Sequence, residues 1–319
     1  MNTDQLRQEI IDYSKEIGID KIGFASADVF DSLKDRLKRQ QKLGYQSGFE
    51  KGSIEERTEP DRLLPEAKSI ISIALAYPSR MKNGPKSTKE ERRGVFCRAS
   101  WGVDYHKVLR EKLEKLSAFI EDKIPDASTK LMVDTGELSD RAVAERAGIG
   151  FSGKNTAIIT PEFGSYVYLG ELITNVPFVP DTPLEDGCGS CTKCLDACPT
   201  GALVQGGQLN AQRCLAFLTQ TKDFLPDEFR PKMGNLFTAS IRVRSSVRTT
   251  NTLIFTTIRN LNQSRMLPSQ SLNRCCGFPT GSSKKRLAIL LDRGVARSHC
   301  SEMHCWRSGI IKMKRLSMT

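Results

Sequence analysis

The chain has 319 residues, and its formal net charge of +11 is concentrated at one end, because residues 237–319 carry 15 Lys and Arg against 2 Asp and Glu. No apolar run approaches the roughly 20 residues of a membrane-spanning helix. The polar start MNTDQLRQEI is unlike an export leader. A chain of this length can also bury hydrophobic cores that are stable without disulfides. These features argue against an integral membrane protein and a disulfide-stapled secreted one, and they predict a cytoplasmic protein whose thiols are reduced or metal-bound.

The first half of the chain predicts helices and strands of one α+β domain. Apolar residues recur at helical spacing after Thr3 and again after Asp104, so each of these polar residues is a plausible N-cap. Strands are predicted at KIGFASAD (21–28), KSIISIALAYP (68–78) and KLMVDTG (130–136). The last strand places Asp134 at a strand end, which is a common position for functional side chains.

Two further elements precede a proline-rich boundary. SDRAVAERAGIG (139–150) predicts a helix that begins at its serine and ends at its glycines. NTAIITPEFGSYVYLGELIT (155–174) predicts a β-hairpin that turns around its Pro-Glu-Phe-Gly stretch. Three prolines follow, at positions 177, 180 and 183. They mark the end of an α+β domain at 1–177 and the beginning of a second domain at about residue 178.

The strongest motif is CGSCTKCLDACP (188–199), which contains Cys188, Cys191, Cys194 and Cys198 and ends in a proline. Thiolates are soft, strong ligands for iron, and a tight turn with cysteine at every third residue aims three sulfurs at one cubane. In two-cluster ferredoxins the fourth cysteine serves the other cluster. The run therefore predicts [4Fe–4S] binding, followed by a helix that starts at TGAL. A structural zinc site or free thiols are the alternatives.

The ligand set of a second cluster is incomplete. Two clusters with four cysteine ligands each need more thiols than residues 1–236 provide, since Cys214 and an isolated Cys97 are the only others there. Four more cysteines lie in the basic tail, at positions 275, 276, 300 and 305. None of these has C-x-x-C spacing, so they do not complete a ferredoxin pattern.

Several stretches share their order and spacing with one protein family. They are EERTEPDRLLPEAKSII (55–71), CRASWGVDYH (97–106), VDTGELSDRAVAERAGIGFSGKNTAIIT (133–160), the cysteine run and QRCLAFLTQ (212–220). With these motifs the chain resembles epoxyqueuosine reductase, the cobalamin-dependent enzyme family of queuosine tRNA modification. The resemblance covers essentially all of residues 1–235. It stops abruptly after RPKMGN, where the family continues with a pattern like R-L-Y-G-C-D-T-C-Q-x-V-C-P.

The resemblance implies a fold, an activity and partners. Residues 1–177 would be a cobalamin-binding catalytic domain related to the scaffold of reductive dehalogenases, and residues 178–236 a truncated two-cluster ferredoxin-like domain. In the family, [4Fe–4S] clusters pass electrons from an external electron donor to cobalamin, which reduces epoxyqueuosine at the tRNA wobble position to queuosine. The expected partner is thus tRNA carrying epoxyqueuosine. The protein is expected to be a monomer without membrane contact.

The resemblance also assigns roles to individual residues. Asp134 matches the family's proton donor, and a carboxyl group that donates near neutral pH needs burial or a negative neighbour to raise its pKa. Five positions would contact cobalamin: Arg57, Cys97, Asp134, Ile158 and Leu169. Five would ligate the clusters: Cys188, Cys191, Cys194, Cys198 and Cys214.

Each of these roles has a simpler alternative. Asp134 is alternatively a strand-end cap, and Arg57 a solvent-exposed arginine beside glutamates. Cys97 taken alone is more often a small buried hydrophobe. We expect His106 to be structural.

The break after residue 235 resembles a reading-frame shift. Read one register over, CSEMHCWRSG (300–309) is compatible with QRNALLALG, which is similar to the family's helical-repeat motif. The same register converts TTIRNLN (256–262) into HHPEFKP and LAILLDRG (287–294) into FGHTAGSW. At position 240, however, the neighbouring frame gives phenylalanine where the family pattern has a cysteine. The missing cluster ligands and the family's helical repeats are therefore expected in the neighbouring frame. Residues 237–319 are predicted to be an out-of-frame, non-native tail, and the activity of the chain to be impaired.

Other interpretations of the chain stay open. Residues 237–319 are alternatively a disordered basic tail that attracts RNA by charge alone. A reductive dehalogenase-like reductase would share cobalamin and the clusters. A plain iron–sulfur electron-transfer protein would need only the cysteine-rich domain, and the large N-terminal domain argues against it.

Overall fold

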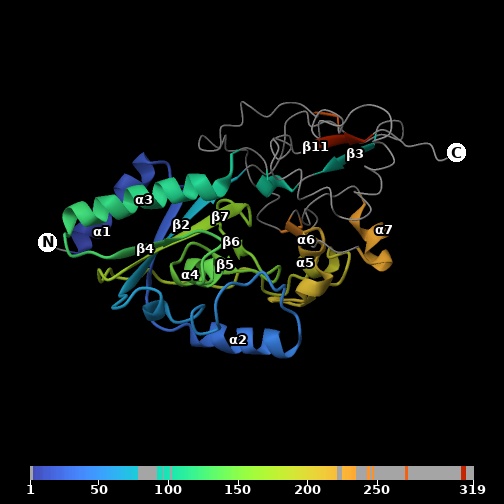
Figure 1. Cartoon of the computed structure of the whole chain (residues 1–319), viewed down its shortest axis with the longest axis horizontal. Coiled ribbons are helices and arrows are strands. Elements are labelled where there is room, and N and C mark those ends of the chain that lie inside the picture. The colour runs from blue at the N-terminus through green and yellow to red at the C-terminus, as the bar shows by residue number, and fades with distance from the viewer. Residues whose placement is uncertain are drawn as a thin grey trace.

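A four-stranded antiparallel sheet forms the centre of the N-terminal region (Figure 1). The structure is a computed structural model, and it describes residues 3–77, 92–95, 97–100, 103–220, 225–234, 243–244, 246–247, 270–271 and 310–313. Along the sheet the strands are β1 (Lys21–Ser26), β2 (Ser69–Ala76), β7 (Val167–Thr174) and β4 (Thr129–Met132). Strand β7 lies between β2 and β4, and its Glu171 is paired with Ser72 on one side and Met132 on the other.

Helices cover both faces of this sheet. Helices α1 (Thr3–Glu16) and α3 (Tyr105–Lys123) pack on one face, and α4 (Asp140–Arg146) packs on the other. Leucines of α2 (Asp31–Lys42) join the cluster beneath α4. Because both faces are covered, every residue of β2 is buried, and successive residues of β7 enter the two cores in turn. The arrangement confirms the predicted α+β fold class.

The cysteine-rich region consists of short elements beside this domain. They are α5 (Lys193–Asp196), β8 (Leu203–Gln205), β9 (Gln208–Leu209), α6 (Leu215–Leu218) and α7 (Arg230–Met233). A small ribbon of β5 (Phe151–Ser152) and β6 (Ile158–Ile159) lies next to them (Figure 1). The two regions are joined by backbone contacts, since the Ala211 N–H donates to the Tyr45 carbonyl at 2.9 Å.

Several minor elements complete the described part. Four 3₁₀ turns occur at η1 (Pro60–Arg62), η2 (Arg98–Ser100), η3 (Ala211–Arg213) and η4 (Asp227–Phe229). A second sheet pairs β3 (Arg92–Val95) with β11 (Ile310–Met313), which is also paired with β10 (Gln270–Ser271). Among the helices that the structure describes, none has both the length and the apolar character of a membrane span.

Most sequence predictions for the N-terminal region are confirmed. The three strands are present, Asp104 caps α3 by accepting from the His106 N–H at 3.0 Å, and α4 follows Ser139 and ends before Gly148. Gly148 has a φ of +66°, which a glycine adopts without steric cost.

Two predicted elements are wrong. The stretch 155–174 is not a simple hairpin, because β6 pairs with β5 while β7 pairs inside the central sheet, and only a Thr160–Gly164 bridge closes the turn. TGAL does not start a helix but leads into strand β8, which turns back to β9 at the Gly206–Gly207 pair. Most of residues 237–319, including all four tail cysteines, lie outside the described residues, so the tail prediction stays a prediction.

Candidate functional site

Asp134 sits in a tight turn directly after β4. Its φ is +53°, and the Thr135 N–H donates to the Val133 carbonyl at 2.5 Å, which closes a three-residue turn around it. Such a backbone conformation is uncommon for a residue other than glycine and is often found at functional sites. The turn leaves the Asp134 side chain 55% exposed at the edge of the sheet. Asp134 is therefore accessible to a large substrate.

Two side chains from the start of α3 hold this carboxylate. The Tyr105 hydroxyl donates to Asp134 Oδ2 at 2.9 Å, and His106 Nε2 lies 3.2 Å from the same oxygen. The other ring nitrogen of His106 lies 2.8 Å from Asp104 Oδ1, which fixes the ring orientation. His106 was expected to be structural. The structure places His106 against Asp134, because the N-terminus of α3 meets the end of β4, and its structural role stays a prediction.

Stacked aromatic rings extend from this site along the sheet. Tyr105 stacks on Tyr168 with ring centroids 4.3 Å apart and an interplanar angle of 1°, and Tyr168 stacks on Tyr77 at 4.3 Å. Burial is the main cause that raises the pKa of Tyr105, and the neighbouring Asp134 charge raises it further. Tyr105 therefore keeps its proton and acts as a hydrogen-bond donor to Asp134.

Two more carboxyl groups lie near Asp134. Asp140 is the first residue of α4, and burial raises its pKa to about 6. Glu171 on β7 is 1% exposed, and within the described part of the chain neither of its carboxyl oxygens has a hydrogen-bond partner. Burial, followed by the charges of Asp140 and Asp134, raises the pKa of Glu171 well above its ordinary value. Two further acidic side chains thus lie near Asp134, one on α4 and one on β7.

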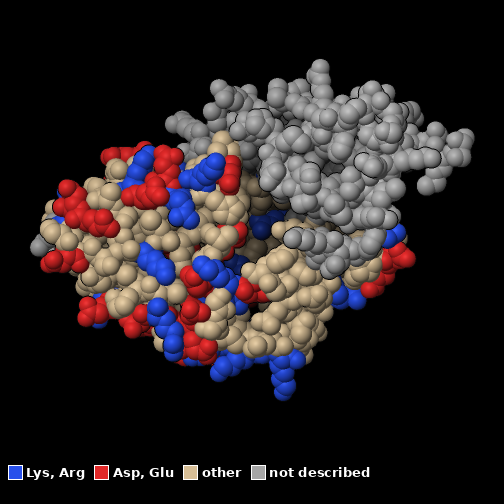
Figure 2. Space-filling view, in the orientation of Figure 1, with Lys and Arg blue, Asp and Glu red and all other residues tan. Residues whose placement is uncertain are grey.

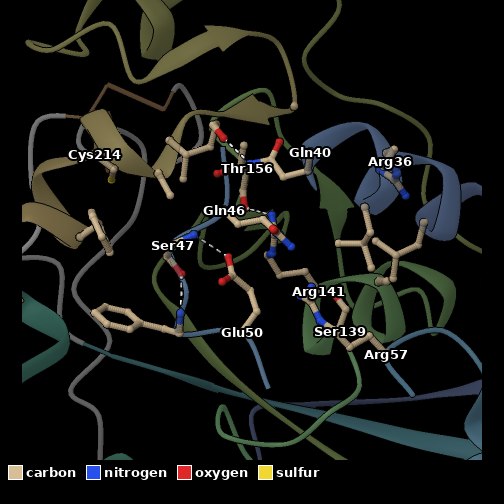
Figure 3. A pocket seen from close by; sticks show the side chains of 18 of the residues that line it. Arg36, Gln40, Gln46, Ser47, Glu50, Arg57, Ser139, Arg141, Thr156 and Cys214 are labelled. Carbon is tan, nitrogen blue, oxygen red and sulfur yellow. Dashed lines mark hydrogen bonds between the residues drawn. The ribbon is translucent and has the colours of Figure 1, made fainter. Parts of the chain in front are cut away.

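A cavity of about 350 Å³ lies between the N-terminal region and the cysteine-rich region. Its walls include Arg36, Arg57, Arg141 and Glu50 from the N-terminal region and Cys214 from the other. Figure 3 shows Arg141 on one side of this space and Cys214 on the opposite side. Figure 2 shows a hollow at this junction, with basic side chains at its bottom. The basic wall suits an anionic group, and the volume suits a nucleotide-sized part of a larger ligand.

The predicted cobalamin contacts are spread over this region. Arg57 lines the cavity, where burial lowers its pKa while Glu50 and Asp140 raise it. Cys97 is half-buried and lies close enough to Tyr77 and Tyr168 to affect their pKa values. Ile158 is 2% exposed and packs with the partly buried Leu169 beneath α4. The structure therefore brings Arg57 to the cavity but leaves Cys97, Ile158 and Leu169 outside its lining.

The residues present fit part of a cobalamin. Three guanidinium groups at the cavity wall match a phosphate, and unpartnered buried polar atoms, such as Asn155 Nδ2, are available beside the neighbouring loop. Cobalamin is larger than this cavity, so these residues would hold only one part of it.

The five predicted cluster ligands fall into two groups. Burial raises the pKa of Cys188 and Cys194, and the neighbouring Cys191 raises both further, whereas the pKa of Cys214 is raised by burial and then by Cys198. This division agrees with a ferredoxin-type run whose fourth cysteine serves the other cluster. Among the described residues, no three His, Cys, Asp or Glu side chains could hold one metal ion. Cubane ligands bind different irons, so this finding concerns a single-ion site only.

Donor groups around the sulfurs favour thiolate ligands. The Lys154 N–H donates to Cys188 Sγ at 3.4 Å. Burial raises the pKa of Cys198, but backbone N–H groups of Leu203 and Thr200, among others, lower it overall. Cys198 and Cys214 also line one cavity of about 220 Å³. N–H donors and a shared cavity fit a cluster at this position.

Arg244 reaches the N-terminal domain from the segment after residue 235. Its Nη1 donates to the Tyr77 hydroxyl at 2.6 Å and to the Ser165 carbonyl at 2.5 Å. Arg244 also lines the cavity shared by Cys198 and Cys214. This residue therefore links the second cysteine group to the tyrosine stack.

Comparison with known proteins gives the family. A model described as epoxyqueuosine reductase QueG, DUF1730 matches residues 57–135, and a 4Fe-4S double cluster binding domain matches residues 187–240. The crystal structure of a selenomethionine-labelled epoxyqueuosine reductase is similar with a TM-score of 0.82 and 56% identity, covering 93% of this chain and 81% of that one. The chain belongs to the epoxyqueuosine reductase family.

Curated epoxyqueuosine reductases agree with this assignment. The Bacillus subtilis protein is 72% identical over 235 residues, which are 74% of this chain and 61% of that protein. The Escherichia coli protein is 34% identical over 239 residues, which are 74% of this chain and 62% of that protein. The chain thus spans less than two thirds of the length of these relatives.

A further structure of an epoxyqueuosine reductase, from Bacillus subtilis, has its Asp134 catalytic loop swung out of the active site. It matches this chain with a TM-score of 0.81 and 58% identity, covering 90% of this chain and 76% of that one.

Sequence reasoning missed three residues of this candidate site. Tyr105 and Asp140 belong to quoted motifs but were given no role, and Glu171 was counted within an apolar strand. The only available signal for Glu171 was a lone acid in a strand that is otherwise buried on both faces.

Proposed function

We propose that this chain is an epoxyqueuosine reductase, which reduces epoxyqueuosine in tRNA to queuosine, with Asp134 as the proton donor. The observation that carries the proposal is the Asp134 carboxylate, held by Tyr105 and His106 in a positive-φ turn. The Bacillus subtilis relative has an Asp134 catalytic loop, which supports a catalytic role for Asp134 here.

The reaction class sets the chemical requirements. Converting an epoxide to an alkene breaks two C–O bonds, forms a C=C bond and releases the oxygen as water. This balance consumes two electrons and two protons. The site must therefore combine a source of electrons with acidic groups, and Asp134 supplies one of the protons.

Cobalamin is the proposed resident cofactor. Arg57 and Arg141 at the cavity wall would hold its anionic part, and Cys97, Ile158 and Leu169 are proposed contacts by resemblance to the family. When bound, cobalamin supplies two-electron reducing power at the epoxide. The protein's own residues orient the substrate against Asp134, and the Tyr105 hydroxyl keeps the carboxylate in place.

Iron–sulfur clusters are the proposed electron carriers. Cys188, Cys191 and Cys194 would ligate one cluster, and Cys198 and Cys214 belong to the other. An external one-electron donor would reduce these clusters. The short distance in sequence between the two cysteine groups supports electron passage through one compact domain.

The tRNA substrate is proposed from both chemistry and relatives. A crystal structure of an epoxyqueuosine reductase contains an epoxyqueuosine-modified stem loop of tRNA-Tyr, and it matches this chain at 59% identity with a TM-score of 0.81, covering 90% of this chain and 76% of that one. The exposed Asp134 side chain supports access by a macromolecular substrate. We also propose that the protein is a cytoplasmic monomer.

We further propose that the remaining ligands of the second cluster are encoded in the neighbouring frame. The domains would then be 1–177 for cobalamin binding, 178–236 for the clusters and 237–319 as an out-of-frame tail. The 235-residue match to the Bacillus subtilis protein supports this division. The coding DNA around codons 233–240 tests it, since stop codons scattered through the other frame would contradict the proposal.

Two measurements test the function. The frame-corrected protein is expected to convert epoxyqueuosine to queuosine in tRNA, and Asp134→Asn should abolish product while cobalamin binding persists. The chain as given should bind cobalamin but hold about four irons or fewer. About eight irons with full turnover in this chain would refute the frame-shift proposal. Absence of product from the frame-corrected protein would refute the activity.

A further inference from the structure

Two side chains of the described part donate toward one oxygen of the Asp134 carboxyl group. The Tyr105 hydroxyl lies 2.9 Å from Asp134 Oδ2, and His106 Nε2 lies 3.2 Å from the same oxygen. The proposed reaction consumes two protons for each epoxide, whereas a carboxylic acid carries one. If Asp134 donates the first proton, which rests on the proposed function, a second proton must reach the leaving oxygen from a neighbouring group or from solvent.

The His106 ring lies between two carboxyl groups. Its Nδ1 is 2.8 Å from Asp104 Oδ1, and its Nε2 is 3.2 Å from Asp134 Oδ2. A ring nitrogen without hydrogen and a carboxylate oxygen both present lone pairs, so each contact needs a hydrogen between its two atoms. A neutral imidazole has one N–H, and an ionised carboxylate has no donor. The trio Asp104, His106 and Asp134 therefore holds one proton more than a neutral imidazole and two carboxylates would.

The hydrogen between His106 and Asp104 stays on the ring. Asp104 Oδ1 also accepts the His106 backbone N–H at 3.0 Å, since Asp104 caps α3. Burial raises the pKa of Asp104, but the hydrogen bonds from the His106 ring and backbone lower it overall. Asp104 is therefore ionised at neutral pH, and Nδ1 keeps its hydrogen. The hydrogen that can be transferred is the one between His106 Nε2 and Asp134 Oδ2.

The surroundings leave His106 as the donor that can release a proton. The Tyr105 ring stacks on the His106 ring, with centroids 4.0 Å apart and an interplanar angle of 28°. Burial, the largest cause, raises the pKa of Tyr105, so its hydroxyl donates a hydrogen bond to Asp134 but keeps its proton. Charged groups within electrostatic range of the trio include Lys107 on α3, Asp140 on α4 and Glu171 on β7.

We propose that His106 supplies the second proton of turnover through Asp134. Because two donors occupy Asp134 Oδ2, Oδ1 carries the first proton and gives it to the epoxide oxygen. The His106 Nε2–H bond then breaks, and its proton passes to the Asp134 carboxylate and on to the oxygen that leaves as water. Neutral His106 keeps its Nδ1–H on Asp104 and regains a proton from solvent, since its side chain is 36% exposed. The two electrons come from the clusters or from a chemical reductant.

Nitrogen-15 NMR of histidine rings tests the proton count in the full chain without cofactor. The sequence has three histidines, and the signals that disappear in His106→Gln belong to His106. At neutral pH the wild type should show a hydrogen on both ring nitrogens of His106. Asp104→Asn removes the charge that holds one of them, so a single ring N–H should remain. A single ring N–H in the wild type would overturn the proposal.

Single-turnover reduction of epoxyqueuosine tRNA tests the functional role. The cobalamin-loaded full chain receives electrons directly from a low-potential chemical reductant, so the clusters are bypassed. His106→Gln keeps an N–H donor toward Asp134 but has no proton to release. Its rate should fall about tenfold, less than the roughly 100-fold that a direct donor contributes, because the exposed Asp134 also takes protons from solvent. The rate of this variant should rise with the concentration of imidazole buffer, whereas the wild-type rate and the affinity for tRNA should not change.

Asp104→Asn should also lower the rate, although asparagine still caps the helix. Asp122→Asn is its matched control, since Asp122 is an exposed aspartate on α3, and it should keep the wild-type rate. A wild-type rate in His106→Gln, or a lower rate that imidazole does not restore, would overturn the proton supply while leaving the proposed function intact. No product from the wild type under chemical reduction would instead overturn the proposed function, and the NMR spectrum would still decide whether His106 holds the additional proton.

Discussion

Asp140→Asn is expected to stabilise the folded protein, and only above the pH at which Asp140 ionises. In the fold, burial raises the Asp140 pKa from the ordinary 3.8 to about 6. A raised pKa means that the folded state binds the proton more tightly than the unfolded state does. The stability associated with the protonated form is therefore present below pH 4 and is lost as pH rises to 6.

The magnitude follows from the two pKa values. A pKa near 6 in place of 3.8 corresponds to about 3 kcal/mol of free energy of unfolding lost by the wild type between low and high pH. Asparagine does not ionise, so the variant keeps this free energy. The attraction between an acidic residue and a helix N-terminus is only about 0.3–1 kcal/mol and does not reverse the sign.

Urea unfolding at pH 4 and pH 8 measures the effect. The difference in free energy of unfolding between Asp140→Asn and wild type should be near zero at pH 4 and should approach about 3 kcal/mol in favour of the variant at pH 8. The exposed Asp122→Asn control should show no such change. An equal difference at both pH values, or a variant less stable at pH 8, would refute the reasoning.

Three other predictions follow from individual contacts. Tyr105→Phe removes the 2.9 Å hydrogen bond to Asp134 but keeps the ring stack, so single turnover should fall about tenfold with unchanged tRNA affinity; an unchanged rate would contradict this. Gly136→Ala would place a Cβ 2.8 Å from Met132 Cβ, and urea unfolding should report a loss of about 1–3 kcal/mol. Limited proteolysis should cut residues 237–319 first, and Arg244→Ala should speed cleavage there; a protease-resistant tail would contradict the tail prediction.

The sequence was sufficient to predict elements that depend on local pattern. The strand before Asp134 and the Asp104 cap follow from periodicity and capping. The pairing of β7 did not follow, because the alternation in 155–174 fits a hairpin and a central strand equally well. Strand β8 was missed because Pro-Thr-Gly is compatible with either a helix start or a turn.

The missed residues of the site have a common physical reason. His106 approaches Asp134 only because α3 packs across the end of β4, and Glu171 approaches Asp140 only because α4 packs on β7. These contacts join segments far apart in the chain. A single sequence carries no direct signal for such contacts, whereas the motif resemblance marked Asp134 without revealing its neighbours.

The segment after residue 235 matters for more than the supply of cluster ligands. Arg244 donates to the Tyr77 hydroxyl, Tyr77 stacks on Tyr168, and Tyr168 stacks on Tyr105, whose hydroxyl holds Asp134. Each ring is packed against the next, so we expect a change at Arg244 to alter the packing of Tyr105. Position 244 lies in the proposed out-of-frame tail, so restoring the frame would replace Arg244 and change both the cavity that it shares with the second cysteine group and the packing behind Asp134.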